Sequence, residues 1–161
     1  MNNEDHYDVL RKFYFARVGS IANMRIWDLP VLPSGTPILS ALKVIGAHRR
    51  VWIIESTETY KLIGVVTEYD ILKFLSGLYG HEHSLARADV LGYIKAETID
   101  DIMTRHLVTI TAEDYIIDAL KKFKNYNIRY LPVVDKDKKL RGELSLHRVV
   151  LCFQKLLSRT I

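Results

Sequence analysis

The chain's 161 residues are enough for one compact domain or for two small domains that are tightly joined. Apolar residues make up 48% and charged residues 26%, which is ordinary for a globular protein, and no apolar run approaches the roughly 20 residues of a membrane span. The net charge of +4 permits an anionic partner but does not demand a nucleic acid. The polar N-terminus lacks a signal-peptide core and the single cysteine, Cys152, excludes an internal disulfide, so we expect a cytoplasmic protein without a membrane partner.

The N-terminal segment is expected to form a helix over residues 4–18, within an extension of residues 1–23. Tyr7, Phe13 and Tyr14 recur at helical spacing, and an aromatic stripe of this kind is more typical of a core or an interface than of a nucleic-acid surface. The residues that follow should be extended up to Gly35, because two prolines interrupt them.

The first module is expected to open with a helix that Thr36 caps and in which Pro37 takes the first helical position. This helix should end near Ala47. The residue pattern then predicts a strand, a polar hairpin loop, a second strand and a second helix at 51–54, 56–61, 62–66 and 68–75.

A loop is expected over residues 76–88, followed by a short linking helix or turn over 90–99. His81 and His83 in this loop suggest a metal site. No third ligand stands at a typical spacing, so a solvated loop is the favoured interpretation.

The second module is expected to begin at Asp101. Thr111 is placed to cap its first helix. The predicted elements are a β-like run, a helix, a strand with its approach, a hairpin loop, a strand and a helix at 106–110, 113–126, 127–135, 136–139, 140–144 and 147–157.

The two modules repeat one another. Gly64 matches Gly142 and Thr67 matches Ser145, each 78 positions later, and the preceding helices match at the same offset. The strand that lies between the helix and the glycine-containing strand of each module matches best at an offset of 80. This spacing is too long for a solenoid repeat and indicates one small module present in two copies.

Residues 64–70 carry the clearest local motif. Thr67 and Asp70 have the spacing of a helix-capping box, in which a hydroxyl stands at the N-cap and a carboxylate three residues later. A helix N-terminus also suits a phosphate, and a hydroxyl beside a carboxylate suits a ribose. On these residues alone a simple cap is favoured, because such boxes are common.

Residues 101–104, 128–135 and 64–70 together resemble a tandem pair of CBS domains, a Bateman module, and the resemblance covers about residues 24–155. It implies a mixed α+β fold: two β-α-β-β-α repeats that pack sheet to sheet with pseudo-twofold symmetry, plus the N-terminal helix. The implied segments are an extension, a first repeat, a linker and a second repeat at 1–23, 24–80, 81–100 and 101–157.

The resemblance also implies a site. Members of the family commonly bind adenosine nucleotides in clefts between the repeats, regulate an attached or partner protein, and do no chemistry themselves. Asp70 would bind the ribose hydroxyls, Thr67 and the arginines would reach phosphates, and backbone groups near 36–38 and 109–111 would frame the adenine. The candidate ligand residues are Asp70, Thr67, Arg49, Arg50, Thr36, Pro37, Ile38, Thr109, Ile110, Thr111, Arg129, Ser145 and Arg148.

The second repeat departs from the family motif. Ser145 keeps the hydroxyl, but Arg148 stands where the ribose-binding acid is expected, so a ribose has no acidic acceptor there. Arg148 suits a phosphate instead. Glu143, which matches Val65, is expected to face solvent, a partner or the second cleft.

Three functions follow in order of preference. The first is a regulatory module that senses AMP, ADP or ATP, with S-adenosylmethionine as a further candidate, and signals to an unknown protein. The alternatives are a dimerisation scaffold with degenerate clefts and, less favoured, a nucleic-acid-binding protein. No nucleophile triad, metal set or carboxylate pair points to an enzyme, so no cofactor is expected. The apolar helix faces favour a homodimer.

Overall fold

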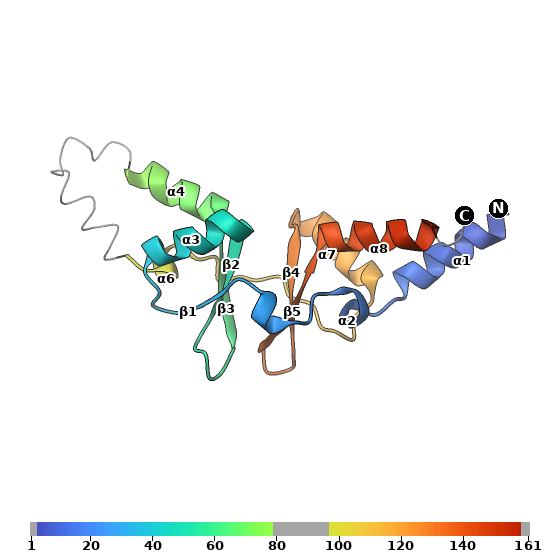
Figure 1. Cartoon of the computed structure of the whole chain (residues 1–161), viewed down its shortest axis with the longest axis horizontal. Coiled ribbons are helices and arrows are strands. Elements are labelled where there is room, and N and C mark those ends of the chain that lie inside the picture. The colour runs from blue at the N-terminus through green and yellow to red at the C-terminus, as the bar shows by residue number, and fades with distance from the viewer. Residues whose placement is uncertain (1–2, 79–96, 159–161) are drawn as a thin grey trace. The chain divides into compact units, whose positions relative to one another are not determined.

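The computed structural model describes residues 3–78 and 97–158, with side chains from residue 7 onward. These residues form two compact units (Figure 1). Unit 1 contains the chain up to Trp27 together with the chain from Val108 onward, and unit 2 contains the chain from Asp28 to Leu107. Each unit is therefore built around the hairpin of one repeat.

Unit 2 is a three-stranded sheet covered by helices. Strand β1 (Val31–Pro33) runs parallel to β2 (Arg50–Ile54), and β2 is antiparallel to β3 (Leu62–Thr67). Helices α3 (Ile38–His48) and α4 (Glu68–Leu78) lie on the same side of the β2–β3 hairpin (Figure 1). The core consists of Ile38, Ala41, Ile45, Val51, Ile53, Val66, Ile71, Ile99 and Met103.

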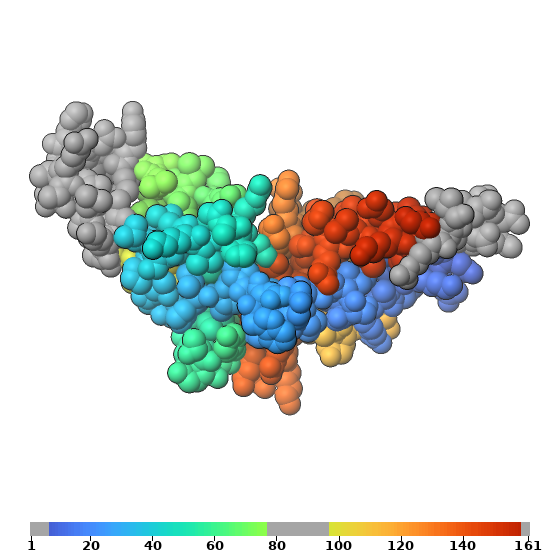
Figure 2. All heavy atoms as spheres, viewed as in Figure 1, coloured from blue at the N-terminus to red at the C-terminus, as the bar shows by residue number. Residues whose placement is uncertain are grey.

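Unit 1 contains the corresponding hairpin, β4 (Tyr130–Val134) and β5 (Leu140–Ser145), with α7 (Ile116–Tyr126) and α8 (Leu146–Ser158). Helices α1 (Asn3–Tyr14) and α2 (Val18–Ile21) complete it, and α1 lies alongside α8 (Figure 2). The rings of Phe13 and Phe153 meet with centroids 5.0 Å apart. The aromatic stripe of α1 therefore contributes a residue to the core of its own chain.

The structure confirms the internal repeat. Helices α3 and α7 have the same length, and both end in a residue with left-handed backbone, Arg49 with φ 64° and Asn127 with φ 50°. The β2–β3 and β4–β5 hairpins have an irregularity at the same place, between Ile53 and Ile54 and between Val133 and Val134. The predicted shift from an offset of 78 to one of 80 therefore lies in the link between helix and strand.

Each hairpin is bridged by a short segment from outside its own repeat, and we call these two the exchanged segments. Asn23, just after α2, forms an antiparallel bridge with Glu143 on β5. Thr104, just after α6 (Ile99–Ile102), forms the same kind of bridge with Val65 on β3. A segment near the start of each repeat thus lies against the hairpin of the other repeat, and sequence order does not follow the two compact units.

Some predicted boundaries are wrong. The N-terminal helix ends at Tyr14 rather than at residue 18, because the backbone becomes extended at Arg17, which bridges to Tyr115. Helix α4 continues to Leu78, so the loop predicted from residue 76 begins too early. His81 and His83 and most of the predicted linker lie outside the described residues.

Both predicted hydroxyl caps on the first helix of each module are also wrong. The N-cap of α3 is Pro37, and the Thr36 hydroxyl donates a hydrogen bond to the Pro33 carbonyl at 2.6 Å. Helix α7 starts only at Ile116, whereas the Thr111 N–H donates to the Asp114 carboxylate at 2.8 Å. Of the β-like run expected at 106–110, the structure has a single bridge from Ile110 to Val133.

Within the described parts of the chain, no helix combines the length and the apolar character needed to cross a membrane. Over the same residues, no group of histidine, cysteine and acidic side chains has the arrangement of a metal site.

Candidate functional site

The site begins where β3 passes directly into α4. Asp70 lies in the first turn of α4 and is only 6% exposed. Its Oδ2 atom accepts hydrogen bonds from the Thr67 backbone N–H at 2.8 Å and from the Thr67 hydroxyl at 2.7 Å. The predicted capping box is therefore confirmed, and one oxygen of the carboxylate is committed to it.

The second oxygen of Asp70 points to a different segment. Its Oδ1 atom accepts a long hydrogen bond, 3.5 Å, from the Thr104 hydroxyl, and the Lys73 amine lies 4.0 Å away. Thr104 is held in place by backbone hydrogen bonds in both directions with Val65, of 2.9 and 3.0 Å. Burying a carboxylate requires partners of this kind, because an unsolvated charge is costly.

Sequence analysis did not select Thr104 as a site residue. It is the last residue of the motif at 101–104 that contributed to the resemblance. Thr104 follows Asp70 by 34 positions and is brought close to it by the bridge to Val65, and no local pattern records such a contact. The only available signal was the motif itself.

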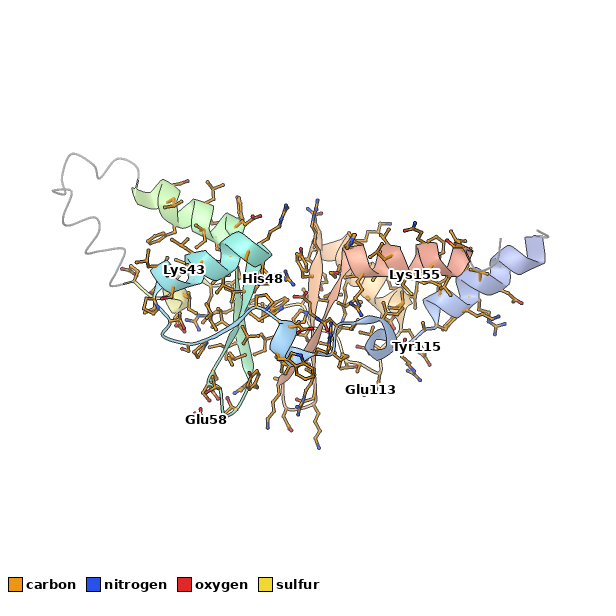
Figure 3. The ribbon with its side chains drawn as sticks, viewed as in Figure 1. Lys43, His48, Glu58, Glu113, Tyr115 and Lys155 are labelled. Atoms are coloured by element: carbon orange, nitrogen blue, oxygen red, sulfur yellow. The ribbon has the colours of Figure 1, made fainter. Side chains whose placement is uncertain are left out.

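The two arginines before β2 have different environments. Arg49 ends α3, its side chain is exposed, and its carbonyl accepts the Glu68 N–H at 3.2 Å, so it stands next to the start of α4. Arg50 is 9% exposed and its Nη1 donates to the His48 carbonyl at 2.8 Å (His48 is labelled in Figure 3). The exposed guanidinium of Arg49 is thus the better placed of the two for a phosphate.

The backbone groups expected to frame an adenine already have partners within their own unit. The Ile38 N–H donates to the Glu97 carbonyl at 3.1 Å, and the Thr36 carbonyl accepts the Ile99 N–H at 3.0 Å. In unit 1 the Ile110 N–H donates to Pro132, the Lys122 amine donates to the Thr109 carbonyl, and Thr111 bonds Asp114. A role for these residues in binding stays a prediction.

The corresponding position in the second repeat is organised differently. The Ser145 hydroxyl accepts the Arg148 N–H at 3.1 Å, which makes Ser145 the cap of α8. The Nε–H of Arg148 donates to the Ile21 carbonyl of α2. Arg148 therefore fixes the N-terminal segment to the second repeat, in the place where Asp70 contacts Thr104 in the first.

Two of the surface grooves of unit 1 are lined by residues of β4 and β5. One lies at the N-terminus of α8 and is lined by Arg129, Tyr130, Ser145, Leu146, His147 and Val150. The exposed guanidinium of Arg129 gives this groove a positive charge. The other is lined by residues of β4 and of the segments that precede α3 and α7, and its apolar residues are Met24, Ile26, Ala112, Val133 and Val134.

The rim of the second groove is formed by Asp135 and Arg141. The Nε and Nη2 atoms of Arg141 lie 2.8 and 2.7 Å from Asp135 Oδ2. Burial raises the pKa of Asp135, but the Lys139 N–H and Arg141 outweigh it and hold this pKa below its usual value. The pair therefore fixes the hairpin turn.

Glu143 does not face solvent, which excludes one of its three predicted environments. It is 6% exposed and its backbone pairs in both directions with Asn23, at 2.8 and 2.9 Å. Elsewhere in unit 1, the Arg17 guanidinium lies 4.1 Å from the centre of the ring of Tyr115, the N-cap residue of α7 that is labelled in Figure 3.

A model of the CBS domain matches residues 18–77 and 99–154. The chain belongs to the CBS domain family. The two matched segments start at α2 and α6, so each exchanged segment is the opening element of its own CBS repeat. The predicted family and the predicted α+β fold of two CBS repeats are confirmed.

Curated relatives match this chain over only part of their own length. The chain is 25% identical over 122 residues to a homoserine O-acetyltransferase of Methanohalobium evestigatum, an alignment that covers 76% of the chain and 22% of that protein. The chain thus spans about a fifth of the length of this curated relative.

Solved structures of CBS pairs have the same fold. The structure of CBSX2 from Arabidopsis thaliana in complex with AMP superposes with a TM-score of 0.70 at 24% identity, over 88% of this chain and 98% of that one. The CBS pair of protein MJ0100, in complex with 5′-methylthioadenosine and S-adenosyl-L-methionine, gives a TM-score of 0.64 at 25% identity, over 86% and 99%.

Proposed function

We propose that this chain is a regulatory module that senses an adenosine nucleotide, AMP, ADP or ATP, and signals to a partner protein. The observation that carries the proposal is the environment of Asp70, a buried carboxylate at a helix N-terminus with one oxygen committed to Thr67 and the other toward the exposed Thr104. An ionised carboxylate accepts hydrogen bonds from ribose hydroxyls. The adenosine compounds bound by CBSX2 and MJ0100 support the same ligand class.

The phosphate end of the ligand distinguishes among adenosine compounds. Exposed Arg49, beside the N-terminus of α4, favours a nucleotide with one or more phosphates. S-Adenosylmethionine has the same ribose but no phosphate, and it is the alternative ligand. No cofactor is required by this proposal.

One site per chain is the expected stoichiometry. In the second repeat the position of the acid is taken by Arg148, which donates to the Ile21 carbonyl. A ribose at this position would meet the Arg148 guanidinium, which already donates a hydrogen bond to α2. We therefore assign the nucleotide to the repeat that contains Thr67 and Asp70.

The output of the module is regulation rather than catalysis. The alignment with the Methanohalobium enzyme covers 22% of that enzyme, and we infer that the shared part is its CBS pair and not its acetyl-transfer machinery. The proposal includes a homodimer, a cytoplasmic location and a regulated protein that the CBS pair contacts.

The test is calorimetric titration of AMP, ADP and ATP into the wild type and Asp70→Asn. The asparagine keeps one acceptor oxygen but loses the charge, so affinity should fall about ten- to a hundredfold. The matched control is Asp101→Asn, because Asp101 accepts the same pair of bonds from Thr98, at 3.0 and 2.9 Å, without a role in the proposed site. Both variants should lose about 1 kcal/mol of stability from their caps.

The outcomes separate the sensor from a scaffold. The sensor is supported if the wild type binds near one nucleotide per chain and only Asp70→Asn weakens the binding. It is contradicted if no nucleotide binds the wild type, and a CBS scaffold with degenerate clefts then becomes the better description. If both variants bind nucleotide like the wild type, Asp70 is a structural cap and the proposed role of its carboxylate is wrong.

A further inference from the structure

The starting observation is that the carboxylate of Asp70 is not free to accept both ribose hydroxyls by itself. Its Oδ2 receives two short bonds from Thr67, at 2.8 and 2.7 Å, which use both lone pairs of that oxygen. Any ligand bond to Asp70 that leaves the cap intact must therefore go to Oδ1. One oxygen is insufficient for two hydroxyls that lie side by side on a ribose ring.

A second oxygen is present beside Oδ1. The Thr104 hydroxyl lies 3.5 Å from it, at the long limit of a hydrogen bond, so Oδ1 and the hydroxyl oxygen each keep acceptor capacity for a ligand. Thr104 is an exposed residue, whereas Asp70 is buried. The hydroxyl thus stands on the solvent side of the carboxylate edge.

We propose that Thr104 Oγ1 and Asp70 Oδ1 together form the diol-binding pair of this module, with one ribose hydroxyl on each oxygen. This rests on the proposed function and adds a specificity-determining residue to it. A threonine hydroxyl has one donor and two acceptor sites, so Thr104 accepts from a ribose hydroxyl while it donates to Asp70. The ligand class is a nucleoside with an intact 2′,3′-diol.

The backbone fixes the position of this hydroxyl. Thr104 is held to Val65 by two hydrogen bonds, and the preceding residue, Met103, is 8% exposed within the core of unit 2. Asp70 is likewise fixed by its cap. The two oxygens therefore keep their separation without a ligand, and preorganisation of this kind lowers the entropic cost of binding.

The second repeat does not contain this pair. The residue that bridges to β5 is Asn23 in place of Thr104, and Arg148 stands in place of Asp70 and donates to Ile21. The two repeats thus differ at both positions of the pair. This difference agrees with one diol site per chain.

The experiment is titration of AMP, 2′-deoxy-AMP and 3′-deoxy-AMP into the wild type and Thr104→Val, which keeps the shape of the side chain but removes its hydroxyl. For the wild type, each deoxynucleotide should bind more weakly than AMP. Thr104→Val should weaken AMP about three- to tenfold and should no longer distinguish AMP from the deoxynucleotide that lacks the hydroxyl bound by Thr104. Thr104→Ser should restore both affinity and discrimination.

The control for the loss of a threonine hydroxyl is Thr98→Val. Thr98 lies in the same segment and donates to Asp101 at 2.9 Å, so it matches the chemistry of the change without touching Asp70. Its affinities for the three nucleotides should equal those of the wild type. The fluorescence emission of buried Trp52 in β2, compared with that of the wild type, checks that unit 2 stays folded in each variant.

Two results would overturn the inference without contradicting the proposed function. One is that the wild type binds AMP and both deoxynucleotides with equal affinity. The other is that Thr104→Val loses affinity for all three nucleotides by the same factor. The first requires no variant and therefore holds even if Thr104→Val fails to fold. If AMP, ADP and ATP all fail to bind the wild type, the proposed function itself is wrong and the inference is lost with it.

Discussion

The exchange of opening segments can be tested at two equivalent glycines. Gly64 on β3 and Gly142 on β5 occupy the same place in the two hairpins, and each lies next to the position where a segment of the other repeat bridges the strand. A methyl group at Gly142 would lie 2.7 Å from the Asn23 carbonyl oxygen and 2.6 Å from the Met24 sulfur. A methyl group at Gly64 would overlap the Met103 sulfur and lie 3.0 Å from its Cγ.

The two glycine-to-alanine substitutions should therefore lower the free energy of unfolding by different amounts. Overpacking typically costs about 1–3 kcal/mol. At Gly64 all three of the nearest atoms belong to the flexible Met103 side chain, so Gly64→Ala should cost about 1 kcal/mol. At Gly142 the obstacle includes a backbone carbonyl that the Asn23 bridge holds in place, so Gly142→Ala should cost about 3 kcal/mol.

The measurement is urea unfolding followed by circular dichroism, with the free energy extrapolated to water. Double-mutant cycles add a sharper criterion. Met103→Ala should offset most of the cost of Gly64→Ala, whereas Met24→Ala should leave most of the cost of Gly142→Ala in place. Equal costs at the two glycines, or relief by both methionine substitutions alike, would refute the assigned contacts.

Two further predictions concern the second repeat and the assembly. Arg148→Leu removes the hydrogen bond to the Ile21 carbonyl, so it should lower stability by about 1.5–3 kcal/mol while AMP affinity in calorimetry stays at the wild-type value; a fall in affinity would show that Arg148 contacts the ligand. Leu72 and Val150 occupy equivalent positions on α4 and α8 and are 55% and 56% exposed, which favours burial in a homodimer. Light scattering should show a dimer for the wild type and a smaller particle for Leu72→Glu, and a monomeric wild type would contradict the dimer.

Strands β2, β3 and β5 could be predicted closely because their pattern is local. The segments expected at 51–54, 62–66 and 140–144 differ from β2, β3 and β5 by one residue at one end. Alternating or continuous burial of apolar residues, bounded by polar turns, is sufficient to place a strand in a small sheet. The repeat strengthened these predictions, because each element was inferred twice.

The starts of α3 and α7 could not be predicted from sequence because distant backbone groups determine them. The first N–H of α3, at Ile38, donates to the Glu97 carbonyl, and the first N–H of α7, at Ile116, donates to the Ala16 carbonyl. These tertiary bonds satisfy donors that a hydroxyl cap would otherwise serve. Thr36 and Thr111 consequently bond within the preceding turns, although their sequence context favours capping.

The same long-range pairing decides what the candidate site contains. Sequence identified Thr67 and Asp70 because they are three residues apart on one motif, and it missed Thr104 because that residue reaches Asp70 only through the bridge to Val65. Thr104 belongs to the opening segment of the second CBS repeat and lies a few positions before Val108, where the chain enters unit 1. A ligand that contacts Asp70 and Thr104 therefore acts on residues of both repeats while it binds within unit 2. A sensor needs such a connection between its site and the rest of the chain, and the exchanged segment supplies it without any further element.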